Sequence, residues 1–530
     1  MDEGRRRRLR PWQIVYLGLV LVRCLLAFSP GYIHPDEWFQ SGEVVAGDLL
    51  GMPTLRTWEF EPKRPIRSMA SLRLLSLPLF ALSLASRAFG FVPSARTIFA
   101  VQRLTALVLS FVIDASVFRL SAQRKAVSTL CLTAASSAIL SFGVRPFSNA
   151  QESAILAACL VLLQTLEHRW SSARPISTTR LSLALGTLAS VGLFTRFTFA
   201  IFAAPVAVSF LALAYRRGIQ GSARRVVPCI VSFIGTSVAH IVLDSRYYGG
   251  GRLHVTPLNA ALYNLQTSNL EQYGVHPRVL HAVVNAPMIL GAGVYLIFLR
   301  EVLYMATKRQ AIKSFAMIEI VSALVAVFSL AALSAQPHQE PRFLLPLVTP
   351  VAVVISASRR RWGGRLIAFS LVQHLLVTLL FSIAHQAGIV PSLLQVNQDL
   401  LHDHQRPVEL HFWRSFMPPR HLLLPPHSHA TVQDHGSATA STMASALSHT
   451  PPTNDTLRLL FAPTWAVVTL NKDDLPFSPL YTFRPHLDMD HLGETVDAWR
   501  NGARSLTDSA AYEVVQLNEP VQREIKLQLT

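Results

Sequence analysis

The sequence predicts an all-α polytopic membrane protein, and three observations lead to that class. The first is composition: 51% of the 530 residues are hydrophobic and 15% are charged, with a mean hydropathy of +0.34. Soluble globular proteins carry about 25% charged residues. The second is a series of long apolar runs, and the third is an uneven distribution of Lys and Arg between the segments that join those runs.

The apolar runs predict about eleven transmembrane helices, because a helix needs ~20 mainly apolar residues to cross a bilayer. These runs lie at 12–30, 96–118, 127–143, 152–167, 180–195, 197–214, 226–243, 281–299, 314–335, 343–357 and 364–386. A further run at 71–94 either spans the membrane or lies at its boundary as an interfacial or re-entrant segment.

Charge distribution decides between these two topologies. With a cytosolic basic N-terminus at 1–11 and a non-spanning 71–94, the loops "RLSAQRK", "YRRGIQGSARR" and "SRRRWGGR" all fall on the cytosolic side, as the positive-inside rule requires. If 71–94 spans, the basic loops move to the wrong face. The first run is longer than the apolar core of a cleaved signal, so an uncleaved signal anchor is favoured over a cleaved signal.

The net charge of +17 is explained by the same cytosolic loops. No zinc-finger spacing or RNP motif accompanies it, so no nucleic-acid partner is predicted. No Walker or Rossmann fingerprint and no DxD motif stands out, which predicts neither a metal nor a cofactor nor a soluble nucleotide donor.

The predicted transmembrane domain covers 12–386 and its first lumenal loop covers 31–95. A lumenal C-terminal region follows at 387–530, with a partly disordered Ser-, His- and Pro-rich segment near 425–455. The histidines there have no regular ligand spacing, so a solvated linker is favoured over a metal site. Asn454 begins the sequon Asn-Asp-Thr and is a glycosylation candidate. The alternation in "APTWAVVTL" predicts a strand in a small terminal domain.

The groups able to carry chemistry gather on the non-cytosolic side of this topology. Asp36 and Glu37 directly follow the first span, "RPFSNAQES" brings Arg145, and "QPHQEPRFLLP" brings further ionisable groups. A charge at the bilayer centre costs about 2.5–3.5 kcal/mol, so charges near spans stand at their ends or serve a function. The alternative for Asp36 and Glu37 is an ordinary solvated loop.

This mixture of residues suits glycosyl transfer from a lipid-phosphate sugar. A carboxylate can accept the proton of a sugar hydroxyl as that hydroxyl attacks. Arginine and histidine can bind the phosphate leaving group. Transporters carry similar polar inventories, so the residue types alone leave that class open.

The motifs themselves resemble a known family. "HPDEWFQSGEVVAGDLLG", "RPFSNAQES", "FTRFTFAIF", "DSRYYG", "TPLNAALYNLQTSNLEQYGVHPR" and "HQEPRFLLPL" look like those of the dolichol-phosphate-mannose-dependent mannosyltransferases of the GT-C class, glycosyltransferase family 22. The pattern is most similar to the GPI mannosyltransferases that add the fourth mannose. The resemblance covers nearly the full chain except 425–455. One departure is Pro146, where the family pattern has Thr, and it puts the role of Arg145 in doubt.

The resemblance implies a GT-C fold and an inverting α1,2-mannosyl transfer in the lumen of the endoplasmic reticulum. The implied donor is dolichol-phosphate-mannose, and the implied acceptor is the third mannose of the GPI precursor glycolipid. It also implies that Asp36 is the general base, with Glu37 as the alternative. The implied donor-phosphate or substrate-binding residues are His34, Arg145, His338, Glu340 and Arg342.

Acceptor recognition is assigned to the loop "YNLQTSNLEQYGVHPR", with the candidates Tyr263, Asn264, His276 and Arg278. A plain structural loop explains the same residues equally well. Arg196 either extends to the membrane interface or contacts a glycan or phosphate. Two other functions remain open: a sister mannosyltransferase acting on the third GPI mannose or on N-glycan precursors, and a transporter or scramblase. No inverted repeat of the kind expected of a transporter is visible.

Overall fold

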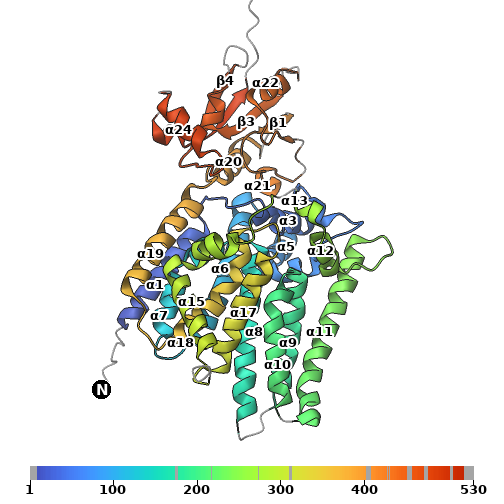
Figure 1. Ribbon diagram of the computed structural model, residues 1–530. Coiled ribbons are helices and arrows are strands. Elements are labelled where there is room, and N and C mark those ends of the chain that lie inside the picture. Colours follow the sequence, from blue (N-terminus) through green and yellow to red (C-terminus); the bar gives the residue numbers. More distant parts are fainter. Residues whose placement is uncertain are drawn as a thin grey trace, which may run out of the picture.

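The computed structural model places a long helical bundle beneath a smaller C-terminal unit (Figure 1). It describes residues 9–172, 177–216, 218–271, 274–308, 313–401, 407–426, 428, 430–449, 456–470, 476–501 and 505–517. The first described helix begins at the lower end of the bundle in Figure 1, and the C-terminal unit caps the upper end. The terms lower and upper end are used below in this sense.

The bundle is built from helices joined mostly by short connections. From the N-terminus these are α1 Pro11–Ala27, α2 Asp36–Phe39, α3 Gly42–Leu50, η1 Trp58–Phe60, α4 Met69–Leu75, α5 Leu77–Phe89, α6 Ala95–Leu120, α7 Ala126–Ala134, η2 Ala138–Phe142, α8 Ser148–Ser171, α9 Thr179–Thr195, α10 Phe199–Tyr215 and α11 Gly218–Tyr248. They continue with α12 Thr256–Asn264, α13 Thr267–Glu271, η3 His281–Asn285, α14 Ala286–Leu290, α15 Ala292–Thr307, α17 Met317–Ser334, η4 Pro341–Leu347, α18 Val348–Ala357, α19 Gly364–Leu379, η5 Leu380–Ala384, α20 Ile389–Val396 and η6 Asn397–Leu401.

Among the described residues, five helices are long and apolar enough to cross a membrane, and up to seven spans result if two bent pairs each count as one. The five are α6, α8, α11 from Gly221, α17, and α19 with η5. The segment predicted to be ambiguous, 71–94, forms one bent pair, α4 and α5, which meet at 80°. The chain is therefore a helical protein of membrane type.

Helix packing in the bundle uses both large and small side chains. The largest buried apolar cluster joins α6, α8, α10, α17 and α18, and contains Val117, Leu160, Phe202, Val325 and Val353. Close van der Waals contact, often at small residues, holds helices together in an apolar solvent. Gly186 of α9 is such a residue, because a Cβ there would lie 2.0 Å from the carbonyl oxygen of Cys229 in α11.

Two of the basic loops predicted to share one face meet in space. The Lys125 ammonium, in "RLSAQRK", donates to the carbonyls of Ser358 and Arg360, in "SRRRWGGR", at 2.6 and 2.9 Å. Arg300, at the end of another predicted span, donates to the Ser358 hydroxyl at 3.1 Å. Backbone carbonyls just past the end of α18 thus accept the Lys125 ammonium, an arrangement that the dipole of a helix C-terminus favours.

The C-terminal unit corrects the prediction of an all-α chain. It holds a five-stranded mixed sheet of order β2-β1-β3-β5-β4. The strands are β1 Val408–Phe412, β2 Thr431–Asp434, β3 Leu457–Pro463, β4 Phe477–Phe483 and β5 Tyr512–Leu517, and the helices are α21 Arg420–Leu423, α22 Ala440–His449, α23 Thr464–Val467, α24 Leu492–Arg500 and α25 Leu506–Ser509. β1 runs parallel to β2 and β3, whereas β5 is antiparallel to β3 and β4.

The strand predicted within "APTWAVVTL" begins earlier than its alternation indicated. β3 ends at Pro463, and the following residues form α23. Both faces of β3 are buried, since Leu459, Leu460 and Phe461 are all fully inaccessible. A strand buried on both faces is a continuous apolar run without alternation, so period-two patterning cannot locate it. β2 and α22 also lie within 425–455, the segment predicted to be partly disordered, and Asn454 lies outside the described residues.

The C-terminal unit is attached to the bundle close to the start of α3. The His421 imidazole of α21 is hydrogen-bonded through Nδ1 to the Glu43 carboxylate and through Nε2, at 3.1 Å, to the Gln102 amide of α6. All three side chains are buried. The Glu43 carboxylate also accepts the Leu55 backbone N–H at 2.9 Å. This buried network fixes the position of the 31–95 segment beneath the C-terminal unit.

Candidate active site

The site begins where the chain leaves α1. Gly31 donates its backbone N–H to the Ser382 carbonyl at 2.9 Å, and a Cβ at Gly31 would lie only 2.3 Å from the Phe381 carbonyl oxygen. The Gly31 carbonyl accepts the Arg145 guanidinium at 2.6 Å. A glycine is therefore required here, and the segment is held between η5 and the loop before α8.

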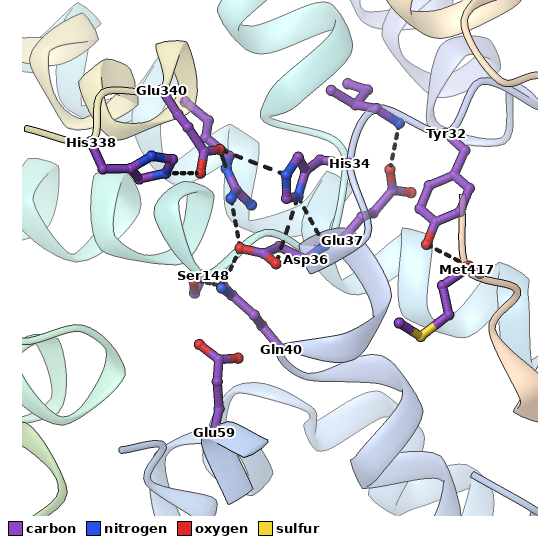
Figure 2. A network of polar contacts seen from close by, with 12 residues as sticks. Tyr32, His34, Asp36, Glu37, Gln40, Glu59, Ser148, His338, Glu340 and Met417 are labelled. Carbon is purple, nitrogen blue, oxygen red and sulfur yellow. Dashed lines mark hydrogen bonds and ion pairs between the residues drawn. The ribbon is translucent and has the colours of Figure 1, made fainter. Parts of the chain in front are cut away.

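Asp36 and Glu37 occupy the first turn of α2, and their side chains diverge. Successive residues of a helix point about 100° apart, so one carboxylate faces an open cavity and the other faces the protein interior. The Asp36 side chain is 26% exposed, whereas that of Glu37 is fully buried. Figure 2 shows the two carboxylates pointing in different directions from the same turn.

Asp36 belongs to a network of charged groups drawn from two distant segments. Arg342 Nη2 lies 2.6 Å from Asp36 Oδ2, and Arg342 Nε lies 2.5 Å from Glu340 Oε2. His338 Nε2 is 2.8 Å from the other Glu340 oxygen. In Figure 2, His34 lies between Glu340 and Asp36, with its ring nitrogens 4.0 and 3.6 Å from their carboxylates. Five predicted site residues are thus in one cluster.

The charges in this cluster set the protonation of its members. Burial alone would raise the pKa of Asp36 and of Glu340, but Arg342 reverses this, so the pKa of Asp36 lies below its ordinary value and that of Glu340 lies well below it. Burial lowers the pKa of His34, with Arg342 adding to the effect. Burial also opposes protonation of His338, but its hydrogen bond to Glu340 raises its pKa overall. The network therefore favours ionised Asp36 and Glu340 beside the Arg342 cation, and it also favours the protonated form of His338.

Glu37 and Arg145 are brought together, but apart from this network. Arg103 Nη2 lies 2.5 Å from Glu37 Oε1 and Arg145 Nη1 lies 3.4 Å from the same oxygen, with all three side chains fully buried. The Arg103 guanidinium also stacks over Trp38 at 5.0 Å. Sequence reasoning did not single out Arg103, although an arginine in the middle of the apolar run 96–118 is a signal that an ionic partner exists.

The exposed side of the Asp36 network opens into a cavity of about 560 Å³. Its lining combines charged side chains with the aromatic side chains of Trp58, Tyr263 and Phe343. Three of the four predicted acceptor residues, Tyr263, Asn264 and His276, line this cavity. Arg278 lies outside the lining and donates to the Ala335 carbonyl. Tyr263 stacks on Trp58, with ring centroids 4.4 Å apart.

Arg196, whose role the sequence left open, lines the same cavity. Its Nη1 donates to the Ser148 hydroxyl at 2.8 Å, and that hydroxyl donates to the Gln40 amide oxygen at 2.8 Å. Gln40 in turn donates to Asp36, as Figure 2 shows. Gln40 and Ser148 were not singled out from the sequence, because uncharged residues beside spans carry no distinctive pattern.

This arrangement can deprotonate a hydroxyl and bind an anion within one cavity. Asp36 is ionised and partly open to the cavity, while the guanidiniums of Arg342 and Arg196 supply fixed positive charge. A carboxylate next to cations that face a cavity is suited to transfer from a phosphate-activated donor.

Two solved structures resemble this chain in fold. It superimposes on ArnT from Cupriavidus metallidurans with a TM-score of 0.53 in the apo state and 0.55 in the state bound to undecaprenyl phosphate. Both alignments cover 96% of this chain and 98% of that chain at 10% identity. The chain therefore shares the fold of ArnT over nearly its whole length.

Sequence comparison then identifies the family. The model of the Alg9-like mannosyltransferase family matches residues 14–425. The chain is 32% identical over 79% of its length to human GPI alpha-1,2-mannosyltransferase 4, covering 78% of that protein. It is 31% identical over 78% of its length to GPI mannosyltransferase 4 of Yarrowia lipolytica, also covering 78% of it. The chain belongs to the Alg9-like mannosyltransferase family and is a membrane mannosyltransferase, which confirms the resemblance found in its motifs.

Proposed function

We propose that this chain transfers the fourth mannose of the GPI precursor, from dolichol-phosphate-mannose to the third mannose, in an α1,2 linkage. The observation that carries the proposal is the contact of Asp36 with Arg342 at the wall of a cavity large enough for a sugar. The likeness to GPI mannosyltransferases from human and Yarrowia lipolytica supports the choice of acceptor.

Asp36 is the general base in this proposal. The acceptor hydroxyl attacks C1 of the donor mannose from the face opposite the phosphate, and its proton passes to the Asp36 carboxylate. The bond between C1 and the phosphate oxygen breaks, and dolichyl phosphate leaves with the bonding electron pair. Attack from the opposite face inverts the anomeric configuration. A phosphate leaving group needs no protonation, so one carboxylate is sufficient.

Arg342 and His338 are assigned to the donor phosphate. Arg342 presents a planar fork of N–H donors, which suits two oxygens of a phosphate. Glu340 orients this fork, since it binds both Arg342 and His338. Arg196 supplies a second guanidinium on the cavity wall. His34 lies between the two carboxylates and orients Asp36 toward the acceptor.

Glu37 and Arg145 take a supporting part in place of the direct roles implied by the motifs. Glu37 forms buried ion pairs with Arg145 and Arg103, and neither Glu37 nor Arg145 lines the cavity. They hold the turn that carries Asp36. Tyr263, Asn264 and His276 are assigned to the acceptor, and Arg278 to the structure of its loop.

The proposed topology has eleven spans, with the active site in the lumen of the endoplasmic reticulum. The five long helices, the bent segment from η3 to α15, four shorter apolar helices and the α7–η2 segment supply these crossings. The pair α4–α5 then lies at the lumenal boundary, which agrees with the position of α5 near α3 and α12 at the upper end in Figure 1. This topology places the basic loops with the cytosolic N-terminus and the C-terminal unit in the lumen.

The test is complementation of cells that lack the fourth GPI mannosyltransferase, read out by profiling their GPI glycans. Four-mannose precursors with the wild-type chain, and three-mannose precursors with Asp36→Asn at equal membrane abundance, are expected. If the wild-type chain leaves three-mannose species unextended, the acceptor is wrong and the sister acceptors are tested next. If no lipid-linked mannose is consumed on any acceptor, the transferase role itself fails.

A further inference from the structure

A second cavity adjoins the catalytic one on the far side of Trp58. It has a volume of about 370 Å³, which falls within the range of small-ligand pockets, roughly 300–1,000 Å³. Trp58 and Thr57 line both cavities. The remaining lining residues are Arg56, Phe60, Glu61, Pro62, Tyr247 and Tyr248. This second cavity is called the outer groove below.

Ion pairs and hydrogen bonds centred on Asp48 hold one wall of the outer groove. Asp48 of α3 binds Arg56 at 2.5 Å and Arg73 at 2.8 Å. Tyr247 donates its hydroxyl to the same carboxylate at 3.2 Å, and both guanidiniums lie over its ring. The Tyr248 hydroxyl is fixed by the Arg67 carbonyl at 2.8 Å. The two tyrosines therefore form a preorganised aromatic wall with a cationic rim.

Trp58 connects the groove to the catalytic cavity. Its side chain remains 42% exposed, although it stacks on Tyr263. Tryptophan near a membrane often marks the lipid interface, but Trp58 lines two cavities that both carry charged residues. Aromatic faces combined with N–H and carboxylate groups suit a ligand with apolar C–H faces and many hydroxyls, and a sugar has both.

We propose that the outer groove is an acceptor subsite that binds the sugar residues preceding the mannose that receives the new one. This assignment rests on the proposed function. The reacting mannose lies in the catalytic cavity near Asp36, and the glycan continues past Trp58 into the groove. Tyr247 and Trp58 contact sugar faces, and Arg56 donates hydrogen bonds to their hydroxyls. The groove thus selects acceptors by length.

The experiment measures kcat/KM for alkyl glycosides that carry one, two or three mannose residues, with the reacting mannose at the outer end. For the purified wild-type chain, kcat/KM rises with acceptor length, mainly through a lower acceptor KM. In Tyr247→Ala the ratio of kcat/KM for the longest acceptor to kcat/KM for the shortest is reduced about fivefold to tenfold, the range of an aromatic contact. The KM for the donor and the rate on the shortest acceptor are unchanged. Arg56→Gln gives a smaller loss of the same kind.

Tyr481→Ala is the matched control, because the hydroxyl of Tyr481 in β4 also donates to an aspartate, Asp399 of η6, at 3.0 Å, and Tyr481 does not line the groove. It leaves the dependence on length intact. A wild-type chain whose kcat/KM does not rise with length overturns the subsite. The subsite is also overturned if Tyr247→Ala lowers kcat/KM equally for all three acceptors. It is likewise overturned if neither Tyr247→Ala nor Arg56→Gln lowers kcat/KM for any acceptor. A wild-type chain that extends neither these glycosides nor the three-mannose GPI precursor overturns the proposed function and this assignment together.

Discussion

Two neighbouring carboxylates of this protein lie in different environments, one at a cavity and the other in the packed interior. Asp36 faces a cavity and contacts Arg342, a cation contributed by the segment before α18. Glu37 faces the bundle interior and pairs with Arg103 and Arg145. One residue of separation on a single helical turn is enough to produce this difference, because the turn lies at the boundary between the packed helices and the cavity.

The comparison teaches that the two sides of α2 depend on each other. The buried side fixes the backbone of the turn through Arg145, which also binds the Gly31 carbonyl. The open side is then free to keep a partly exposed carboxylate aimed at the cavity. A buried ion pair is weak evidence for stability, but removing one partner is costly. Removing the Asp36 carboxylate should therefore affect transfer, whereas removing the Glu37 carboxylate should affect stability.

The largest expected effect is the loss of transfer in Asp36→Asn. An amide cannot accept the proton of the attacking hydroxyl, so kcat falls by about 10²–10⁴-fold. Thermal stability in detergent remains close to that of the wild type, since Asn keeps the shape of the side chain. The measurement is single-turnover transfer with saturating donor. Retained activity would assign the base to another carboxylate.

Glu37→Gln removes the buried carboxylate of α2. Arg103 and Arg145 are left buried without a counter-ion, which costs about 3–5 kcal/mol of folding free energy. We expect low membrane abundance and a lowered melting temperature, with substantial activity in each remaining folded molecule. The measurements are the melting temperature in a thermal-shift assay and the transfer activity per folded molecule. A stable but inactive Glu37→Gln protein would reverse the assignments of the two carboxylates.

The motif "HPDE" located the site, but the sequence could not decide which carboxylate faces the cavity. That choice depends on Arg103 and Arg342, which lie in α6 and η4, and no local pattern around residue 36 reveals these partners. The positions of the five long apolar helices followed from apolar runs in the sequence, whereas the run 281–299 is broken by a bend of 116°. The C-terminal sheet did not, because β3 is buried on both faces and β2 has only four residues. Spatial partners and strand pairing are decided by long-range contacts.

Arg342→Lys tests whether the guanidinium at the cavity wall binds the donor phosphate. Lysine keeps the charge but cannot bind Asp36 and Glu340 through separate N–H groups while also presenting a fork to phosphate. Hydrogen bonds to charged groups contribute about 1.5–3 kcal/mol each, so donor KM rises roughly tenfold to a hundredfold. Thermal stability changes less than in Glu37→Gln. The measurement is donor KM at fixed acceptor. Unchanged use of the donor would remove Arg342 from the phosphate site.

The smallest effect expected is a dependence of donor binding on alkaline pH. The pKa of His338 is raised above its ordinary value of 6.5, so its positive charge is complete below pH 6.5 and is lost as the pH rises through the raised value. The lowered pKa values of Asp36 and Glu340 keep both carboxylates ionised throughout this range. Donor KM in the wild-type chain therefore increases a few-fold as the pH rises from below 6.5 through the raised pKa of His338, about the effect of one lost charge near a phosphate.

His338→Gln is the variant that assigns this dependence. Glutamine keeps a hydrogen-bond donor to Glu340 but cannot be protonated, so its donor KM is raised already at pH 6.5 and stays flat as the pH increases. Acceptor KM should not follow the same curve, because His338 is assigned to the phosphate. A wild-type alkaline rise that persists in His338→Gln would place the titrating group elsewhere. Among the ionisable groups of the cluster, His34 would not explain it, since burial lowers its pKa and it is already neutral there.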